Sequence, residues 1–269
     1  MTVSGDKNRF FEAMLKGGDK YGVKFFLSSD WYAEWDERAL LDASRMACRF
    51  QMMEEIAARY SRHRSFYGWY WPNEACLTPY FTESFIRHVN QCSAEARRLT
   101  PKARTLTAPY GTHQAVADDR FVRQLEMLDV DVIAYQDEVG CLRMDAARSA
   151  ECFARLRQAH DRVPQRALWA DVETFAWEGP PNRQTSPLIP APFERVQAQL
   201  EAVSPYVDKI LIYQYQGLMN RPGTRAFAGH PDSTRLYTDY VAWLKRSGDR
   251  KSTRLNSSHE VPSRMPSSA

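Results

Sequence analysis

Short runs rich in β-branched and aromatic residues alternate along the chain with longer stretches whose apolar residues recur at helical spacing. The runs predict strands at residues 23–28, 66–71, 104–108, 132–136, 167–172 and 210–215. The longer stretches predict helices at residues 10–15, 40–57, 85–96, 121–128, 152–159, 193–203 and 237–244. This order predicts a parallel sheet, because each helix returns the chain to the edge from which the next strand starts.

Two α/β architectures fit such an alternation, an open doubly wound sheet and a barrel. Neither GxGxxG nor GxxxxGK[ST] follows any predicted strand, and polar residues gather where the strands end. Both features favour a (β/α)8 TIM barrel, whose chemistry lies at the carboxyl ends of its strands. Six strand–helix units cannot close that barrel, and helix 10–15 has no strand before it. We therefore expect an incomplete barrel that lacks its first two strands, with unpaired edges that favour aggregation.

The end of the chain differs from the rest. Residues 249–259, DRKSTRLNSSH, resemble the in-frame translation of a common sequencing-library adapter, and residues 260–269 show no apolar periodicity. The predicted organisation is a partial barrel at 1–248 and a disordered tail at 249–269. We interpret the tail as a sequencing-adapter artefact, and a natural solvated tail is the alternative.

Composition and charge narrow the function classes. Hydrophobic residues make up 43% of the chain and charged residues 26%, and no apolar run reaches the roughly 18 residues of a membrane span. The net charge of +3 lies mostly in the tail, so a nucleic-acid partner is not expected. The five cysteines form no CxxC pair, which favours free thiols. No apolar leader follows Met1, and the cellular compartment stays open.

Acidic residues stand at the ends of two aromatic-rich predicted strands. The first run continues as FYGWYWPNE and ends in Asn73 and Glu74. In the second, LWADVETF, strand alternation places Trp169, Asp171 and Glu173 on one face. Acidic side chains that point into a barrel are costly unless they reach its mouth, are hydrogen-bonded or perform chemistry. Pairing of each glutamate with an arginine at the rim is the alternative.

Opposed carboxyl groups among aromatic side chains suit cleavage of a glycosidic bond. One carboxyl group protonates the leaving oxygen, and the other attacks or stabilises the oxocarbenium-like centre. We expect Glu74 and Glu173 to be the catalytic pair and the substrate to be an oligo- or polysaccharide.

Three blocks of sequence carry a resemblance to a known family. FYGWY at 66–70, VDVIAYQD at 130–137 and LWADVETF at 168–175 resemble the signature blocks of an uncharacterised bacterial barrel family, domain of unknown function 4434, which is regarded as glycoside-hydrolase-like. The resemblance covers about residues 21–216. It implies that the strand at residue 23 is the third of the barrel, so that Glu74 ends strand four and Glu173 ends strand seven. That pattern is similar to glycoside hydrolase clan A, whose acid/base glutamate follows an asparagine on strand four and whose nucleophile lies on strand seven.

Other polar and aromatic residues follow the predicted strands and are candidates for binding sugar. They are Asn73, Trp31, Tyr110, Gln136, Asp137 and Gln214. Each has a plainer alternative: the aromatic residues pack, and Asp137 caps its loop. His113 is expected to be a solvated side chain. The loop 176–190 fits either a semi-rigid wall over the site or a surface excursion.

The sequence thus predicts a retaining glycoside hydrolase that needs no cofactor and no metal. A non-catalytic carbohydrate-binding barrel is the alternative from another class. Metal-assisted hydrolysis, with Asp171 and Asp137 as ligands, is a second enzymatic alternative.

Overall fold

The computed structural model describes residues 5–29, 37–181, 186–225 and 227–255. The chain divides into two compact units. The first contains Met1–Glu173 and Ala198–Tyr213, and the second contains Thr174–Gln197 and Gln214–Ala269. The two units are described separately below.

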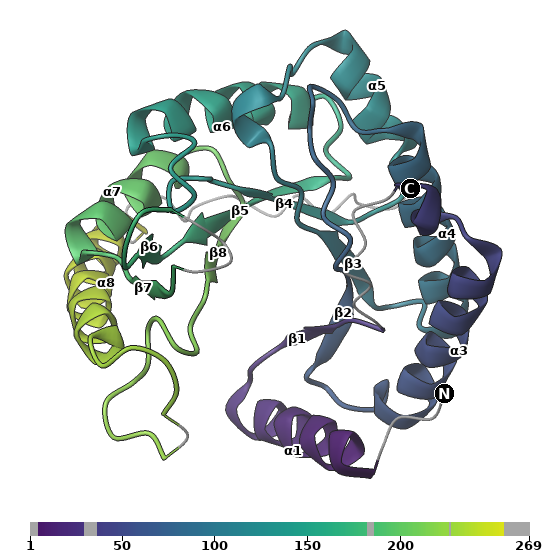
Figure 1. Ribbon diagram of the computed structural model, residues 1–269, viewed down its shortest axis with the longest axis horizontal. Helices are drawn as coiled ribbons and strands as arrows, with labels where there is room; N and C mark the ends of the chain where they lie inside the picture. Colours follow the sequence, from purple (N-terminus) through teal and green to yellow (C-terminus); the bar gives the residue numbers. More distant parts are fainter. Residues whose placement is uncertain (1–4, 30–36, 182–185, 226, 256–269) are drawn as a thin grey trace, which may run out of the picture. The chain divides into compact units, whose positions relative to one another are not determined.

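The first unit is built on a 6-stranded parallel sheet in the order β1-β2-β3-β4-β5-β8 (Figure 1). Its strands are β1 (Phe25–Leu27), β2 (Phe66–Trp71), β3 (Arg104–Thr107), β4 (Val132–Gln136), β5 (Ala167–Glu173) and β8 (Lys209–Tyr213). The order follows the chain without reversal, so the sheet has no switch point of the doubly wound kind. It curls as part of a barrel wall, with β1 and β8 as its edges. The predicted incomplete (β/α)8 barrel is confirmed, and all of the predicted strands are present.

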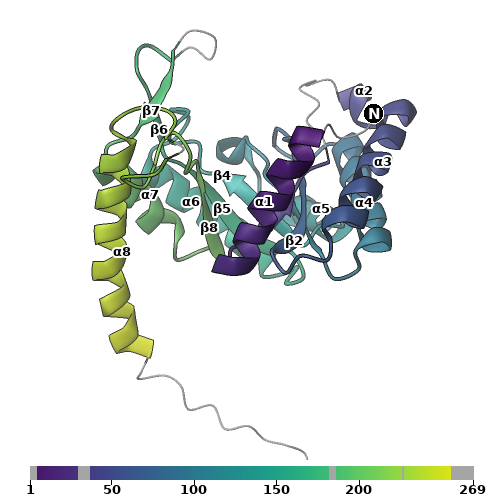
Figure 2. The ribbon, with the colours of Figure 1, turned by 90° about the horizontal axis from the view of Figure 1, so that it is seen from below.

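Helices connect the strands and lie on the convex side of this sheet (Figures 1 and 2). They are α1 (Gly5–Tyr21), α2 (Glu37–Leu40), α3 (Ala43–Tyr60), α4 (Glu83–Leu99), α5 (Asp119–Met127), α6 (Ala146–His160) and α7 (Phe193–Val203), of which α1 precedes β1. Asp118 and Asp145 begin α5 and α6 by accepting a hydrogen bond from the backbone N–H three residues later. Such caps stabilise a helix by about 1 kcal/mol each.

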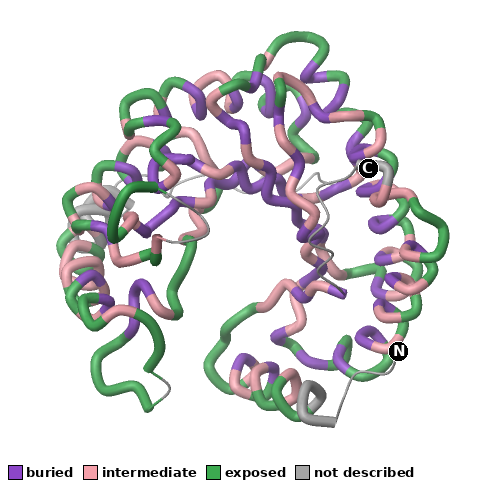
Figure 3. The backbone as a smooth tube through the Cα atoms, in the orientation of Figure 1, coloured by how far each residue is buried: buried purple, intermediate pink, exposed green. Residues whose placement is uncertain are grey.

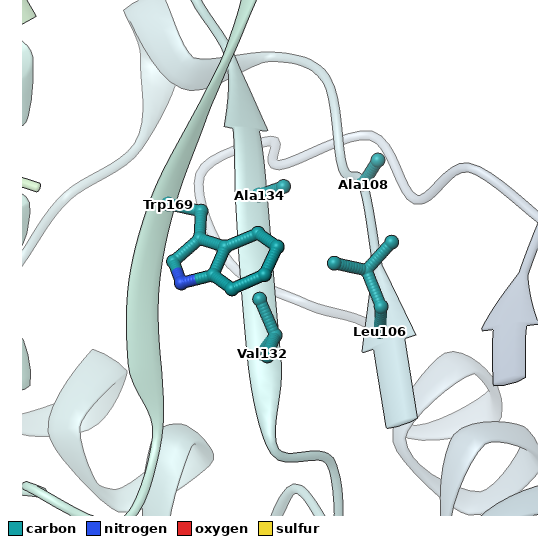
Figure 4. Close-up of a cluster of buried hydrophobic side chains, with 5 residues drawn as sticks. All are labelled: Leu106, Ala108, Val132, Ala134 and Trp169. Atoms are coloured by element: carbon teal, nitrogen blue, oxygen red, sulfur yellow. The ribbon is translucent and has the colours of Figure 1, made fainter. Parts of the chain in front are cut away.

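The two faces of the sheet are buried differently. Leu168, Ala170 and Val172 alternate along β5 on the face that meets the helices, and all three are fully buried. The opposite, concave face carries a cluster of Leu106, Ala108, Val132, Ala134 and Trp169, shown in Figure 4. The buried positions follow the strands in Figure 3. This cluster forms the floor above which the polar strand ends lie.

The second unit contains an antiparallel hairpin of β6 (Phe175–Trp177) and β7 (Leu188–Pro190), together with α8 (Ser233–Leu255). The loop predicted at 176–190 therefore begins and ends in paired strands. Helix α8 continues past Asp249 to Leu255, into the segment predicted to be a tail, and residues 256–269 lie outside the described part of the chain. Within the described residues, every helix is too short or too polar to cross a bilayer.

Candidate active site

The carboxyl end of β5 brings two acidic side chains to the concave face of the sheet. Trp169 packs into the floor cluster on that face, so strand alternation places Asp171 and Glu173 on the same face above it. In the sheet, Asp171 pairs with Gln136 of β4 and Glu173 pairs with Tyr213 of β8. The predicted strand is present, and Asp171 and Glu173 lie at its carboxyl end.

Glu173 is only 4% exposed and is held at several points. Its Oε2 accepts a hydrogen bond from the backbone N–H of Cys141 at 2.6 Å. Its own backbone N–H donates to Asp137 Oδ1 at 3.0 Å, and its carbonyl oxygen accepts from Gln199 Nε2 at 3.0 Å. A carboxylate bonded in this way has a fixed orientation.

Glu74 lies three residues beyond the end of β2 and is half-buried. The preceding residue, Asn73, accepts a hydrogen bond at Oδ1 from Nη2 of Arg49 on α3 at 3.0 Å. The segment that follows is tied to the end of β3, because Leu77 N donates to the carbonyl oxygen of Tyr110 at 2.9 Å. Glu74 is thus carried by a segment anchored on both sides.

The electrostatics link the two glutamates. Burial, together with the neighbouring carboxylates of Glu173 and Glu74, raises the pKa of Asp171 to about 7. Burial also raises the pKa of Tyr213, again with contributions from Glu74, Asp171 and Glu173. Because such interactions fall off with distance, Glu74 and Glu173 both lie near Asp171 and Tyr213. Burial, Glu74 and Asp171 raise the pKa of Tyr70 in the same way.

The residues that the sequence predicts to bind sugar do not all lie at the ends of the strands. Tyr110 and Gln136 are half-buried beyond or at the ends of β3 and β4. Asp137 is 0% exposed, and its carboxylate is bonded to buried groups, which favours the loop-capping alternative over contact with sugar. Trp31 lies outside the described residues. Gln214 is exposed and belongs to the second unit, so its position relative to the glutamates is not assigned.

One expectation needs correction. His113 is not a free solvated side chain, because its Nδ1 lies 2.8 Å from Oε2 of the buried Glu138. The tryptophans of β2 both point to α4. Trp69 Nε1 donates to Thr100 Oγ1 at 2.8 Å, and Trp71 Nε1 donates to Ser93 Oγ at 3.2 Å. They pack the sheet against its helix.

The geometry also decides the metal alternative that used Asp171 and Asp137. Asp171 is on the concave face, whereas Asp137 follows Gln136 by one position and bonds to Gln199 of α7 on the other face. Both oxygens of the Asp137 carboxylate accept hydrogen bonds from buried N–H groups, which disfavours that side chain as a metal ligand. Within the described residues, no group of three or more His, Cys, Asp or Glu side chains is arranged to hold a metal.

Several residues of the site were not singled out from the sequence. Tyr70 and Tyr213 are on the concave strand positions, and alternation along β2 and β8 was a signal that could have found them. Gln199 and Arg49 come from helices, and their contacts with the strand ends have no local sequence signal. Glu138 accepts from Gly111 N at 2.9 Å and anchors the loop after β4, with a backbone φ of 52°.

Comparison with known proteins agrees with this architecture. The sequence profile of the family described as Domain of unknown function (DUF4434) matches residues 5–226, and the chain belongs to that family. No curated protein matches the sequence closely enough to be reported as a relative.

Among solved structures, the chain is similar to three sugar-processing proteins. A candidate α-L-fucosidase from Bacteroides thetaiotaomicron has a TM-score of 0.68 at 18% identity, over 91% of this chain and 74% of that one. A β-D-glucuronidase from Dictyoglomus thermophilum has a TM-score of 0.56 at 14% identity, over 86% of this chain and 42% of that one. A β-galacturonidase from Eisenbergiella tayi has a TM-score of 0.53 at 14% identity, over 86% and 43%. The chain spans less than half of the last two. At these identities the likeness establishes a glycoside-hydrolase-like barrel fold.

Proposed function

We propose that this protein is a glycoside hydrolase that cleaves its substrate with retention of anomeric configuration. Glu74 acts as the general acid and base, and Glu173 acts as the nucleophile. The observation that supports the proposal is that both glutamates contribute to the raised pKa values of Asp171 and Tyr213 in a glycoside-hydrolase-like barrel. The carboxyl ends of barrel strands are where such enzymes place their chemistry.

The reaction begins with two coordinated events. Glu74 donates its proton to the glycosidic oxygen as the bond from that oxygen to the anomeric carbon breaks. Glu173 attacks the anomeric carbon and forms a glycosyl ester. Glu74, now a carboxylate, takes a proton from water, and that water releases the sugar and regenerates Glu173.

The local contacts suit these roles. The hydrogen bond from Cys141 N fixes the orientation of the Glu173 carboxylate. Arg49 holds Asn73 through Oδ1, and the Nδ2 group of Asn73 makes no hydrogen bond within the described residues. That amide group is placed to donate to a sugar hydroxyl. The strand-four and strand-seven positions similar to clan A support the same assignment.

The test is turnover of aryl glycosides of neutral sugars by the wild-type chain and by Glu74→Gln and Glu173→Gln. We expect each substitution to reduce kcat by about 10²–10⁴-fold, since each removes an acid, base or nucleophile. Glu126→Gln, at an exposed position on α5, is the matched control and is expected to retain wild-type turnover.

The two roles can be separated chemically. Glu173→Ala should regain turnover with added azide and yield a glycosyl azide of inverted configuration, because azide enters where the carboxylate would attack. Wild-type turnover in either glutamine variant would contradict the mechanism. Saturable sugar binding without turnover would instead support the non-catalytic carbohydrate-binding barrel.

A further inference from the structure

The side chain of Asp137 accepts a hydrogen bond that a backbone carbonyl group of β4 would accept if that strand were longer. Strand β4 ends at Gln136, and its last pair with β5 joins Gln136 to Asp171. Glu173 therefore extends beyond the end of β4, and its backbone N–H meets no strand carbonyl on that side. The Asp137 carboxylate replaces that carbonyl, because its Oδ1 accepts from Glu173 N at 3.0 Å.

Gln199 completes the arrangement from α7. Its Nε2 donates both to Asp137 Oδ2 at 2.7 Å and to the carbonyl oxygen of Glu173 at 3.0 Å. Both backbone polar groups of Glu173 are thus held by one pair of side chains, and both of these are 0% exposed. We call Asp137 and Gln199 the Glu173 clamp.

The loop that begins at Asp137 also reaches the carboxylate of Glu173. Cys141 N donates to Glu173 Oε2 at 2.6 Å. The conformation of this loop is set by left-handed backbone at Glu138 (φ 52°) and Leu142 (φ 58°). Such conformations cost energy in residues other than glycine, and they persist where the surroundings enforce them.

The Glu173 clamp includes polar groups whose burial destabilises the folded state. The Asp137 carboxylate is fully buried, and the groups that bond it are amide N–H donors. Burial accordingly raises the pKa of Asp137 to about 7. Gln199 Oε1 is buried without a hydrogen-bond partner in the described part of the chain. The pair satisfies both backbone polar groups of Glu173, and it does so at the cost of one buried carboxylate and one buried amide oxygen without a partner.

We propose that Asp137 and Gln199 are positioning residues of the hydrolytic reaction, which fix the backbone and thereby the carboxylate of Glu173 at the anomeric carbon. Neither residue touches the substrate. The inference rests on the proposed role of Glu173 as the nucleophile.

A second glutamine provides a matched control. Gln124 on α5 is also buried and also bonds both backbone groups of one residue, because its Oε1 accepts from Phe81 N at 3.0 Å and its Nε2 donates to Phe81 O at 2.7 Å. Gln199→Leu and Gln124→Leu therefore each remove a buried glutamine that bonds the backbone of a distant residue. Only the first of them holds a residue proposed to react.

The experiment measures kcat, KM, melting temperature and backbone amide exchange for wild type, Asp137→Asn, Gln199→Leu and Gln124→Leu. Asp137→Asn keeps the shape of the side chain but replaces one of its acceptor oxygens by an NH2 group. That group cannot accept a hydrogen bond from Glu173 N or Gln199 Nε2. We expect both clamp variants to lose about 10–10²-fold in kcat with KM nearly unchanged, since a small displacement of a reacting group has effects of this size. Exchange of the Glu173 amide should also accelerate. Gln124→Leu should lower the melting temperature by a similar amount and leave kcat within about twofold.

The outcomes separate the inference from the proposed function. Equal kcat loss in all three variants would reduce the clamp to a structural role and overturn the inference while the hydrolase assignment stands. Unchanged exchange of the Glu173 amide in Asp137→Asn would overturn it independently of any substrate. A wild-type chain that turns over no glycoside would defeat the proposed function, and the exchange measurement would still decide whether the clamp holds Glu173.

Discussion

Carboxylates at the amino ends of the strands have different surroundings from Asp171 at the carboxyl ends. At the amino ends of the strands, acidic side chains are bonded to groups that stabilise the charge. Asp19 Oδ2 lies 2.7 Å from His63 Nδ1, Asp131 accepts from Thr105 N at 2.7 Å, and Asp208 accepts from Leu168 N at 2.9 Å. At the carboxyl ends, Asp171 instead lies near Glu173 and Glu74, and their carboxylates contribute to its raised pKa.

The pKa values express this difference. The hydrogen bond to His63 is the main cause that lowers the pKa of Asp19 to about 2. Burial and the neighbouring glutamates raise the pKa of Asp171 to about 7. The charge of Asp19, at the amino ends of the strands, therefore stabilises the folded state. The charge of Asp171, at the carboxyl ends, destabilises it. In barrels, that division separates the stabilising face from the reacting face.

The largest expected effect comes from bringing a further negative charge, carried by the substrate, to the carboxyl ends of the strands. Aryl glycosides whose reacting sugar carries a carboxylate should be poorer substrates than their neutral counterparts, by about 10-fold or more in kcat/KM, because like charges brought together are repelled. Asp171→Asn should narrow that ratio. The measurement is kcat/KM for matched pairs such as an aryl glucoside and an aryl glucuronide. Equal or better turnover of the uronides would contradict a site of net negative character.

Removal of the charge at Asp171 should stabilise the fold. A carboxyl group whose folded pKa is raised favours folding below its unfolded pKa of 3.8, and this contribution is lost as the pH rises towards about 7. Asp171→Asn should therefore be more stable than wild type at pH 8, on the order of 1 kcal/mol after allowance for partial exposure, and nearly equal at pH 4. Urea unfolding at the two pH values measures this. Lower stability of the variant at pH 8 would mean that Asp171 is a stabilising residue.

Asp19→Asn should show the opposite sign. The folded pKa of Asp19 is lowered, so its contribution to stability is present above the unfolded value of 3.8 and is lost as the pH falls through about 2. The variant should be less stable than wild type at pH 7 and converge with it near pH 2, with a small effect because the group is at the surface. The same urea titrations provide the comparison. A stabilising Asp19→Asn substitution at pH 7 would remove the contrast between the amino and carboxyl ends of the strands.

The strands, and the place of Glu173 at the end of one of them, follow from local pattern. Runs such as 132–136 and 167–172 are short and rich in β-branched and apolar residues, and alternation from Trp169 places Asp171 and Glu173 together. The same rule places Asp137 opposite to Gln136, so its burial was also available from the sequence. The direction of Trp69 and Trp71 depends on polar partners in α4, and the bond from Gln199 depends on how α7 packs. The β6–β7 hairpin lies within a proline- and glycine-rich segment in which strand signals are weak.

The central claim is that Glu173 attacks the anomeric carbon while Glu74 serves as its acid and base. The most direct measurement is the mass of peptides from the chain after reaction with a 2-deoxy-2-fluoroglycoside that has a good leaving group, since such a sugar slows hydrolysis of the glycosyl ester. The account predicts one added sugar, attached to Glu173, and no adduct in Glu173→Gln. An adduct on another residue, or on Glu173→Gln as readily as on wild type, would contradict it.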